Sequence, residues 1–171
     1  MNIFVLHTCP KIAASLHCDQ HIGKMILESA QMLSTVASQL FPINFITGNY
    51  YKATHEKHPC TLWLQESPRN MKWLIELCYH LDNIRQNMGA DPHSSMEIVK
   101  QFEYDVGESE HVNGVPINHI FCGPLHLQYN SDLSIPQKYQ AFYKLKAKEW
   151  ESKGREMTWK NRQIPEFMLT S

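Results

Sequence analysis

The sequence predicts an all-α fold, a compact single domain over residues 1–171 with a short extended segment at its N-terminus. Two observations predict it: apolar residues recur at helical spacing along most of the chain, and serine, proline and glycine bound these stretches where helices start and stop. A length of 171 residues, 43% hydrophobic residues and 19% charged residues fit one globular domain. The chain contains no internal repeat and no low-complexity tract.

The N-terminal part contains an apolar run and then the longest periodic stretch. Ile3-Phe4-Val5-Leu6 fits either a short strand or a segment packed on the core. Helical periodicity then extends from Pro10 to Leu40, with a break expected near Cys18. The helix is expected to start at Pro10 because proline suits a first helical turn.

The middle of the chain is punctuated by proline. Pro42 is expected to stop the first long helix, so residues 42–60 are predicted to form a loop. A short helix is expected over Thr61–Glu66. Ser67-Pro68 then starts a long helix, because serine caps and proline suits the first position, and Gly89 ends it.

The C-terminal part alternates weak and strong helical signals. Ser94 or Ser95 is expected to cap a helix that ends near Tyr104. Residues 105–133 are rich in glycine and proline and are predicted to be irregular. Ser134 and Pro136 open a last long helix over Ile135–Lys153.

One face of the first long helix carries an unusual set of polar side chains. At about 100° per residue, six of them fall within a stripe of about 80°. They are His17, His21, Lys24, Glu28, Gln31 and Thr35. A solvated helix face is one interpretation, and a face that performs proton transfer or nucleophilic attack is the other.

Within this stripe, two pairs have the i,i+4 spacing that places side chains together. Lys24 and Glu28 form either a surface ion pair or an amine beside a carboxylate in a cleft. His17 and His21 could bind one metal ion, with His55, His58 and Cys60 completing the site, although no HExxH or paired CxxC motif is present.

Phosphate contacts are predicted at two places. Arg69 and Asn70 lie in the first turn of the helix that Ser67-Pro68 opens, where free amides favour anions, and His55 and His58 lie just upstream. Residues 138–171 contain 8 Lys and Arg against 4 Asp and Glu, whereas the whole chain has a net charge of −1. Trp150 and Trp159 lie among these cations, so this segment fits either a solvated helix or a surface that stacks bases.

The five cysteines include no C-x-x-C spacing, and the chain starts without a secretion signal. These features favour reduced thiols in a cytoplasm. No stretch approaches the 18 apolar residues that a membrane span requires, so no membrane association is expected.

Several of these motifs resemble a widespread set of uncharacterised phage and bacterial proteins. The resemblance covers most of the chain. It rests on Met1–Leu6, on Cys18-Asp19-x-His21-x-x-Lys24-Met25-x-Leu27-Glu28-x-Ala30-Gln31, on His55-x-x-His58-Pro59-Cys60 and on Trp159-Lys160-Asn161-Arg162-x-x-Pro165. This set resembles more distantly the phage pyrimidine-dimer DNA glycosylases (endonuclease V-like), which also cleave abasic sites. The shared layout is Asp-Gln-His at Asp19 leading a helix with a glutamate, Glu28, nine residues later.

The resemblance implies a compact all-α DNA-repair enzyme that flips its target base and needs no metal or organic cofactor. In that family the N-terminal amine attacks the sugar C1′ and forms a Schiff base, and the helix glutamate moves protons. Asparagine at position 2 disfavours removal of the preceding methionine, so the amine here is expected on Met1, with Lys24 as the alternative.

The predicted function is therefore an N-glycosylase and lyase acting on a pyrimidine or a damaged or modified base in DNA or a nucleotide. The predicted catalytic residues are Glu28, Lys24, His21 and Met1, and the predicted substrate-binding residues are His17, Asp19, Gln31, His55, His58, Arg69 and Asn70. The alternative is a non-catalytic phage accessory protein that binds nucleic acid or a host protein.

Overall fold

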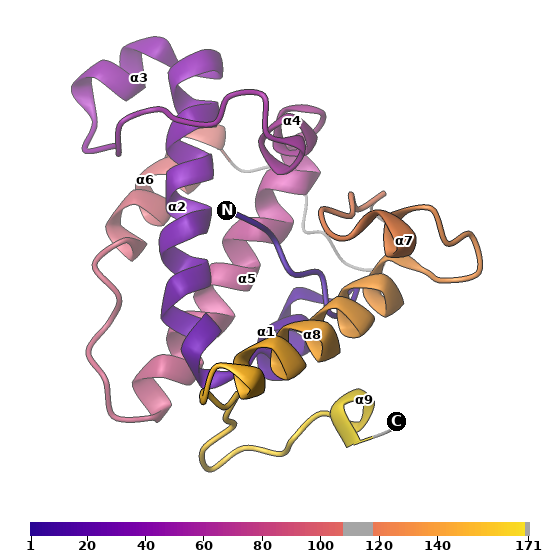
Figure 1. Cartoon of the computed structure of the whole chain (residues 1–171). Helices are drawn as coiled ribbons and strands as arrows, with labels where there is room; N and C mark the ends of the chain where they lie inside the picture. The colour runs from indigo at the N-terminus through magenta and orange to yellow at the C-terminus, as the bar shows by residue number, and fades with distance from the viewer. Residues whose placement is uncertain (108–117, 170–171) are drawn as a thin grey trace.

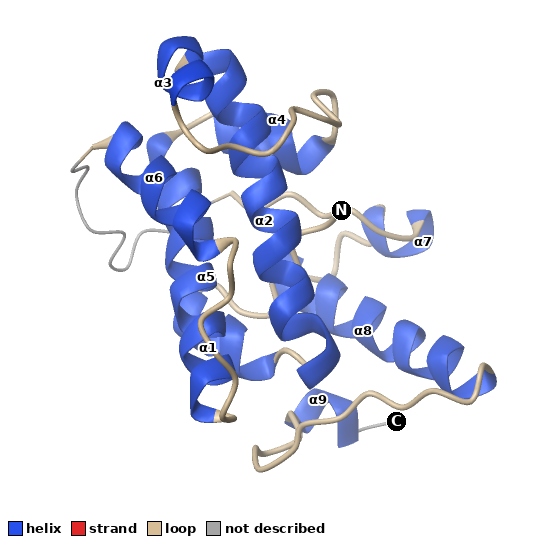
Figure 2. Cartoon of the chain, turned by 90° about the vertical axis from the view of Figure 1, so that its left-hand side faces the viewer, coloured by secondary structure: helices blue, strands red, loops and turns tan. Residues whose placement is uncertain are grey.

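The computed structural model describes residues 1–107 and 118–169, which form helices and connecting segments without any strand (Figures 1 and 2). The prediction of an all-α fold is confirmed for this part of the chain. Its helices are α1 (Pro10–Leu16), α2 (Asp19–Leu40), α3 (Pro42–Thr47), α4 (Pro59–Gln65), α5 (Pro68–Asn87), α6 (Met96–Val106), α7 (Leu125–Gln128), α8 (Ile135–Ser152) and α9 (Glu166–Leu169).

Helix α2 lies at the centre of the fold and packs against α3, α4, α5 and α6 (Figure 1). Its apolar face is buried, because Ile22, Met25, Ile26 and Leu33 are almost completely shielded from solvent. Helix α5 supplies the facing core residues, and α1 packs on the same helix. The core is therefore built mainly between the two longest helices, as amphipathic helices require.

The predicted helix starts are confirmed where a serine precedes a proline. Ser67 accepts a hydrogen bond from the Arg69 amide at the start of α5, at 3.1 Å. Ser134 and Gln137 form a capping box at the start of α8. Gly89 follows α5 with a φ of 85°, a left-handed conformation that favours glycine. Local side-chain chemistry thus decides where these helices begin and end.

Two predicted loops contain helices. Pro42 was expected to stop the first helix and start a loop, but it occupies the first turn of α3, because a proline that ends one helix also suits the start of the next. Helix α7 lies within the irregular stretch predicted over 105–133, of which residues 108–117 lie outside the described part of the chain.

The N-terminal segment is a buried extended chain and forms no strand. Ile3–Leu6 are each at most 4% exposed. Phe4 stacks on the imidazole of His21, and it also contacts the rings of Tyr139 and Tyr143 from α8. This segment therefore packs between α2 and α8, and Figure 1 shows it running from beside the middle of α2 down toward α8.

The C-terminal segment is fastened to the start of α2 by Asp19 and Arg162. The Arg162 guanidinium donates to Asp19 Oδ1 at 2.7 Å and to the His17 carbonyl at 2.8 Å. Asp19 Oδ2 accepts from Thr158 and from the Lys160 amide. Burial alone would raise the pKa of Asp19, but the bonds from these donors outweigh burial and lower it.

Removing Arg162 is expected to destabilise the fold. Arg162→Ala leaves Asp19, whose side chain is 11% exposed, without its cationic partner. Such a truncation costs about 3 kcal/mol of the free energy of unfolding, measured by urea titration. The control is Arg155→Ala on the same segment, because it also removes a guanidinium group but at an exposed position. Equal stability of the two variants would contradict this role.

No described helix is both long enough and apolar enough to cross a membrane.

Candidate active site at the chain N-terminus

The carboxylate of Glu28 is the point where the N-terminal segment meets α2. Glu28 Oε2 accepts the Asn2 amide at 2.9 Å and lies 4.0 Å from the Met1 α-amine. Glu28 Oε1 lies 3.7 Å from Lys24 Nζ. The Glu28 side chain is only 15% exposed, whereas that of Lys24 is 57% exposed. The amines of Met1, whose side chain is 6% exposed, and of the exposed Lys24 therefore both lie beside one shielded carboxylate.

The packing of the N-terminal segment fixes this arrangement. Asn2 is bonded to Glu28, and Phe4 stacks on His21 about two helical turns earlier, so the segment runs antiparallel to α2. The Asn2 side chain donates to the Cys122 carbonyl at 2.7 Å. Burial of the apolar residues that follow holds the first two residues against the helix. The α-amine is thereby positioned by the core, against which the Met1 side chain, 6% exposed, also packs.

A second group of side chains lies beside the amine. It comprises His58, Cys60 and Cys122, whose ligand atoms all lie within 4.8 Å of one another. Burial lowers the pKa of His58, and the Met1 ammonium and His55 lower it further, while Glu28 opposes them. The amine, Glu28 and this group consequently lie within electrostatic reach of one another.

The two thiols of this group are directly paired. Cys60 Sγ lies 3.4 Å from Cys122 Sγ, and its thiol donates to that sulfur. This bond and burial raise the pKa of Cys60. The same bond lowers the pKa of Cys122 despite its partial burial, and the Cys60 amide and the Met1 ammonium act in the same direction. Cys122 is therefore the thiol that ionises more readily.

The two histidines at the start of the polar stripe belong to the core. His17 and His21 are at most 1% exposed, and each Nδ1 is bonded, to the Ala13 carbonyl and to the Tyr143 hydroxyl respectively. Burial lowers the pKa of His17 to about 4 and that of His21 to about 3. The structure thus places both predicted site residues beneath α8, His21 about two helical turns before Glu28 on α2 and His17 at the end of α1.

The other predicted substrate-binding residues are dispersed. Asp19 is engaged by the C-terminal segment, and Asn70 is buried with its amide bonded to the Trp63 carbonyl at 2.7 Å. Arg69 is exposed at the start of α5, His55 is exposed with a φ of 57°, and Gln31 is half-buried on α2. Of the predicted site, the structure joins Met1, Lys24, Glu28 and His58.

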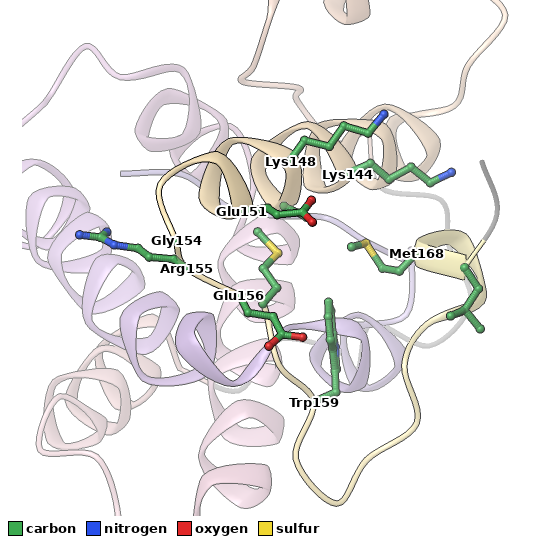
Figure 3. A pocket seen from close by; sticks show the side chains of 11 residues that line it. Lys144, Lys148, Glu151, Gly154, Arg155, Glu156, Trp159 and Met168 are labelled. Carbon is green, nitrogen blue, oxygen red and sulfur yellow. The ribbon is translucent and has the colours of Figure 1, made fainter.

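Two large cavities lie at the C-terminal end of the molecule. One, of about 710 Å³, lies between α8 and the chain that follows it, and a second of about 660 Å³ is bordered by Arg162 and Phe167. In Figure 3 the amines of Lys144 and Lys148 lie at the rim of the first, while Glu151 and Trp159 border the hollow. Acidic and basic side chains both line this cavity, so this surface is not the uniformly basic one that a phosphate backbone prefers.

Three residues of the site were not identified from the sequence. Asn2 and Cys122 belong to no recognisable motif in the sequence, and Tyr139 has the spacing of a core aromatic residue. The Tyr139 hydroxyl accepts the Cys122 amide at 3.1 Å and lies 3.2 Å from Asn2 Oδ1. Cys122 comes 62 positions after Cys60, and no spacing rule joins them.

Comparison with known proteins gives no match: no family model, no curated protein and no solved structure is similar to this chain.

Proposed function

We propose that this protein is an N-glycosylase and abasic-site lyase that acts on DNA or a nucleotide through the α-amine of Met1. The observation that carries the proposal is the 4.0 Å approach of that amine to Glu28 Oε2, in a site where the carboxylate is 15% exposed. An amine beside a shielded carboxylate is the arrangement that Schiff-base chemistry needs, because the amine must lose a proton to attack.

In the proposed reaction, the neutral amine attacks C1′ of the sugar. The C1′–N bond breaks, and the departing base keeps the electron pair and takes up a proton. Opening of the C1′–O4′ bond then gives a protonated Schiff base. On a DNA substrate, loss of a proton from C2′ then breaks the C3′–O bond, and the downstream strand leaves with the electron pair as its 5′-phosphate end. Water finally hydrolyses the imine and frees the amine. Glu28 receives and returns the proton of the amine.

The position of the α-amine favours Met1 over Lys24 as the nucleophile. The α-amine is held beside Glu28 by the bond from the Asn2 amide to that carboxylate, whereas the Lys24 side chain is 57% exposed. Lys24 is placed to contact a substrate phosphate at the edge of the site.

Borohydride trapping tests this proposal. Protein with a free Met1 amine, verified by intact mass, is incubated with an abasic-site or pyrimidine-dimer oligonucleotide and borohydride. We expect a covalent adduct that peptide mapping places on Met1. Acetylation of the α-amine should abolish the adduct, and Lys24→Ala should retain it.

The matched control is Lys100→Ala, at an exposed lysine on α6, which should trap as the unaltered protein does. An adduct confined to Lys24 would move the nucleophile to that residue and overturn the assignment to Met1. DNA binding without any adduct would instead support the accessory-protein alternative. In that case the double variant Lys24→Ala with Glu28→Gln should still bind DNA.

A further inference from the structure

We propose that His58, Cys60 and Cys122 form a binding site for a divalent transition-metal ion, for which Zn²⁺ is the best match. The ligand atoms of these residues lie within 4.8 Å of one another. They come from three parts of the fold: the residue before α4, its first turn, and the segment before α7. Among residues 1–107 and 118–169, no other three His, Cys, Asp or Glu side chains meet in this way.

The separation of the two sulfurs agrees with tetrahedral coordination. Zinc binds thiolate sulfur at about 2.3 Å, so two sulfurs on one tetrahedral ion lie about 3.8 Å apart. Cys60 Sγ and Cys122 Sγ are 3.4 Å apart, and an outward shift of a few tenths of an ångström admits the ion. A disulfide would require the sulfurs to approach to about 2.05 Å and would leave His58 without a role.

The donor set selects the class of ion. Two thiolates and an imidazole favour zinc and similar borderline ions, whereas magnesium and calcium prefer oxygen ligands. On binding, each S–H bond breaks, its proton passes to solvent, and a sulfur–metal bond forms without any change of oxidation state. The two thiolate charges then neutralise the charge of the ion, which suits the partly buried position of the pair.

Surrounding hydrogen bonds hold the ligands in place. Asn2 Nδ2 donates to the Cys122 carbonyl at 2.7 Å, and the Tyr139 hydroxyl accepts the Cys122 amide at 3.1 Å. His58 Nδ1 accepts the Cys60 amide at 3.2 Å, a single bond that ligation of the ring replaces. Asn2 Oδ1 also lies 3.8 Å from Cys60 Sγ. The group supplies three protein ligands, and three protein ligands with an open fourth position are typical of catalytic zinc sites.

Metal analysis of the whole protein tests this site independently of the amine chemistry, because the measurement is metal content and not turnover. Protein purified with reductant is assayed for zinc, then stripped with a chelator and titrated with Co²⁺. We expect one metal ion per chain and, with Co²⁺, the thiolate charge-transfer and tetrahedral visible bands. Cys60→Ser, Cys122→Ser and His58→Ala should each weaken Co²⁺ binding at least about tenfold.

The controls are Cys9→Ser, at a cysteine outside the group, and His80→Ala, at a half-buried histidine on α5; both should bind metal as the unaltered protein does. Thermal unfolding identifies any variant that fails to fold, and the metal binding of the ligand variants that do fold then tests the proposal. The proposal is overturned if reduced protein takes up neither ion, or if metal persists in both folded cysteine variants. It is equally overturned if peptide mapping of protein purified without reductant finds a disulfide between Cys60 and Cys122.

Discussion

Glu28→Gln lowers the rate of Schiff-base formation by at least about 100-fold, the usual effect of removing a group that transfers a proton. Glutamine has the same shape, and its carbonyl can still accept the Asn2 amide that Glu28 accepts at 2.9 Å. The Met1 amine therefore keeps its place and loses only the base beside it. Single-turnover trapping with borohydride on an abasic-site oligonucleotide measures the rate directly.

A matched control is available on α6, where Glu97 lies exposed in the first helical turn. Glu97→Gln makes the same chemical change away from the site and should leave the trapping rate unchanged. Thermal unfolding of both variants shows that each is folded. A Glu28→Gln rate within twofold of that of the unaltered protein would remove Glu28 from the proposed mechanism, even if Met1 is the nucleophile.

The helical part of the fold follows from local rules. Ser67 and Ser134 cap the helices that they were predicted to start, because a serine oxygen satisfies an amide that the first turn leaves free. The break near Cys18 separates α1 from α2 as expected. Helix α3 was missed because the proline at position 42 fits both the end of one helix and the start of another.

The candidate site was predictable only as far as one helix face determines it. The spacing of Lys24 and Glu28 places them together on any helix, and the structure has them 3.7 Å apart. What covers that face depends on the rest of the fold. Phe4 and Tyr143 bury His21, whereas the same face is left polar and partly open at Glu28.

Contacts between distant parts of the chain further limit how much of the site the sequence can predict. Cys122 reaches Cys60 only because the segment before α7 packs beside the N-terminal residues, where Asn2 bonds to the Cys122 carbonyl. Neither residue has a sequence neighbour that marks this contact. His58 and Cys60 were predicted together as possible metal ligands from their loop motif, but nothing in the sequence indicated Cys122 as their partner.

Acidification from pH 7 to pH 5 is expected to cost about 6 kcal/mol of the free energy of unfolding. Burial lowers the pKa of His17 and of His119 to about 4, and that of His21 to about 3. In the unfolded chain a histidine has a pKa of about 6.5, so the unfolded state binds more protons below that pH. Stability is therefore complete above about pH 6.5 and is lost as the pH falls toward the folded-state values.

The size of the loss follows from the same pKa differences. At pH 5 each of the three unfolded histidines has gained a proton that the folded form excludes, which costs about 2 kcal/mol per residue. Partial burial also lowers the pKa of His58, His80 and His93, and these histidines add in the same direction. A domain with a typical stability of about 5–15 kcal/mol would approach unfolding near pH 5.

His119 provides the sharpest test, because its ring contacts the rings of Trp63 and Trp73 and neither ring nitrogen has a hydrogen-bond partner among the described residues. His119→Phe keeps the aromatic packing and removes one titrating group, so urea titrations should show the loss between pH 7 and pH 5 reduced by about 2 kcal/mol. His126→Phe, at an exposed histidine on α7, should leave the loss unchanged. An unaltered pH dependence in His119→Phe would show that His119 takes up its proton without unfolding, and burial would then not be the source of the acid sensitivity.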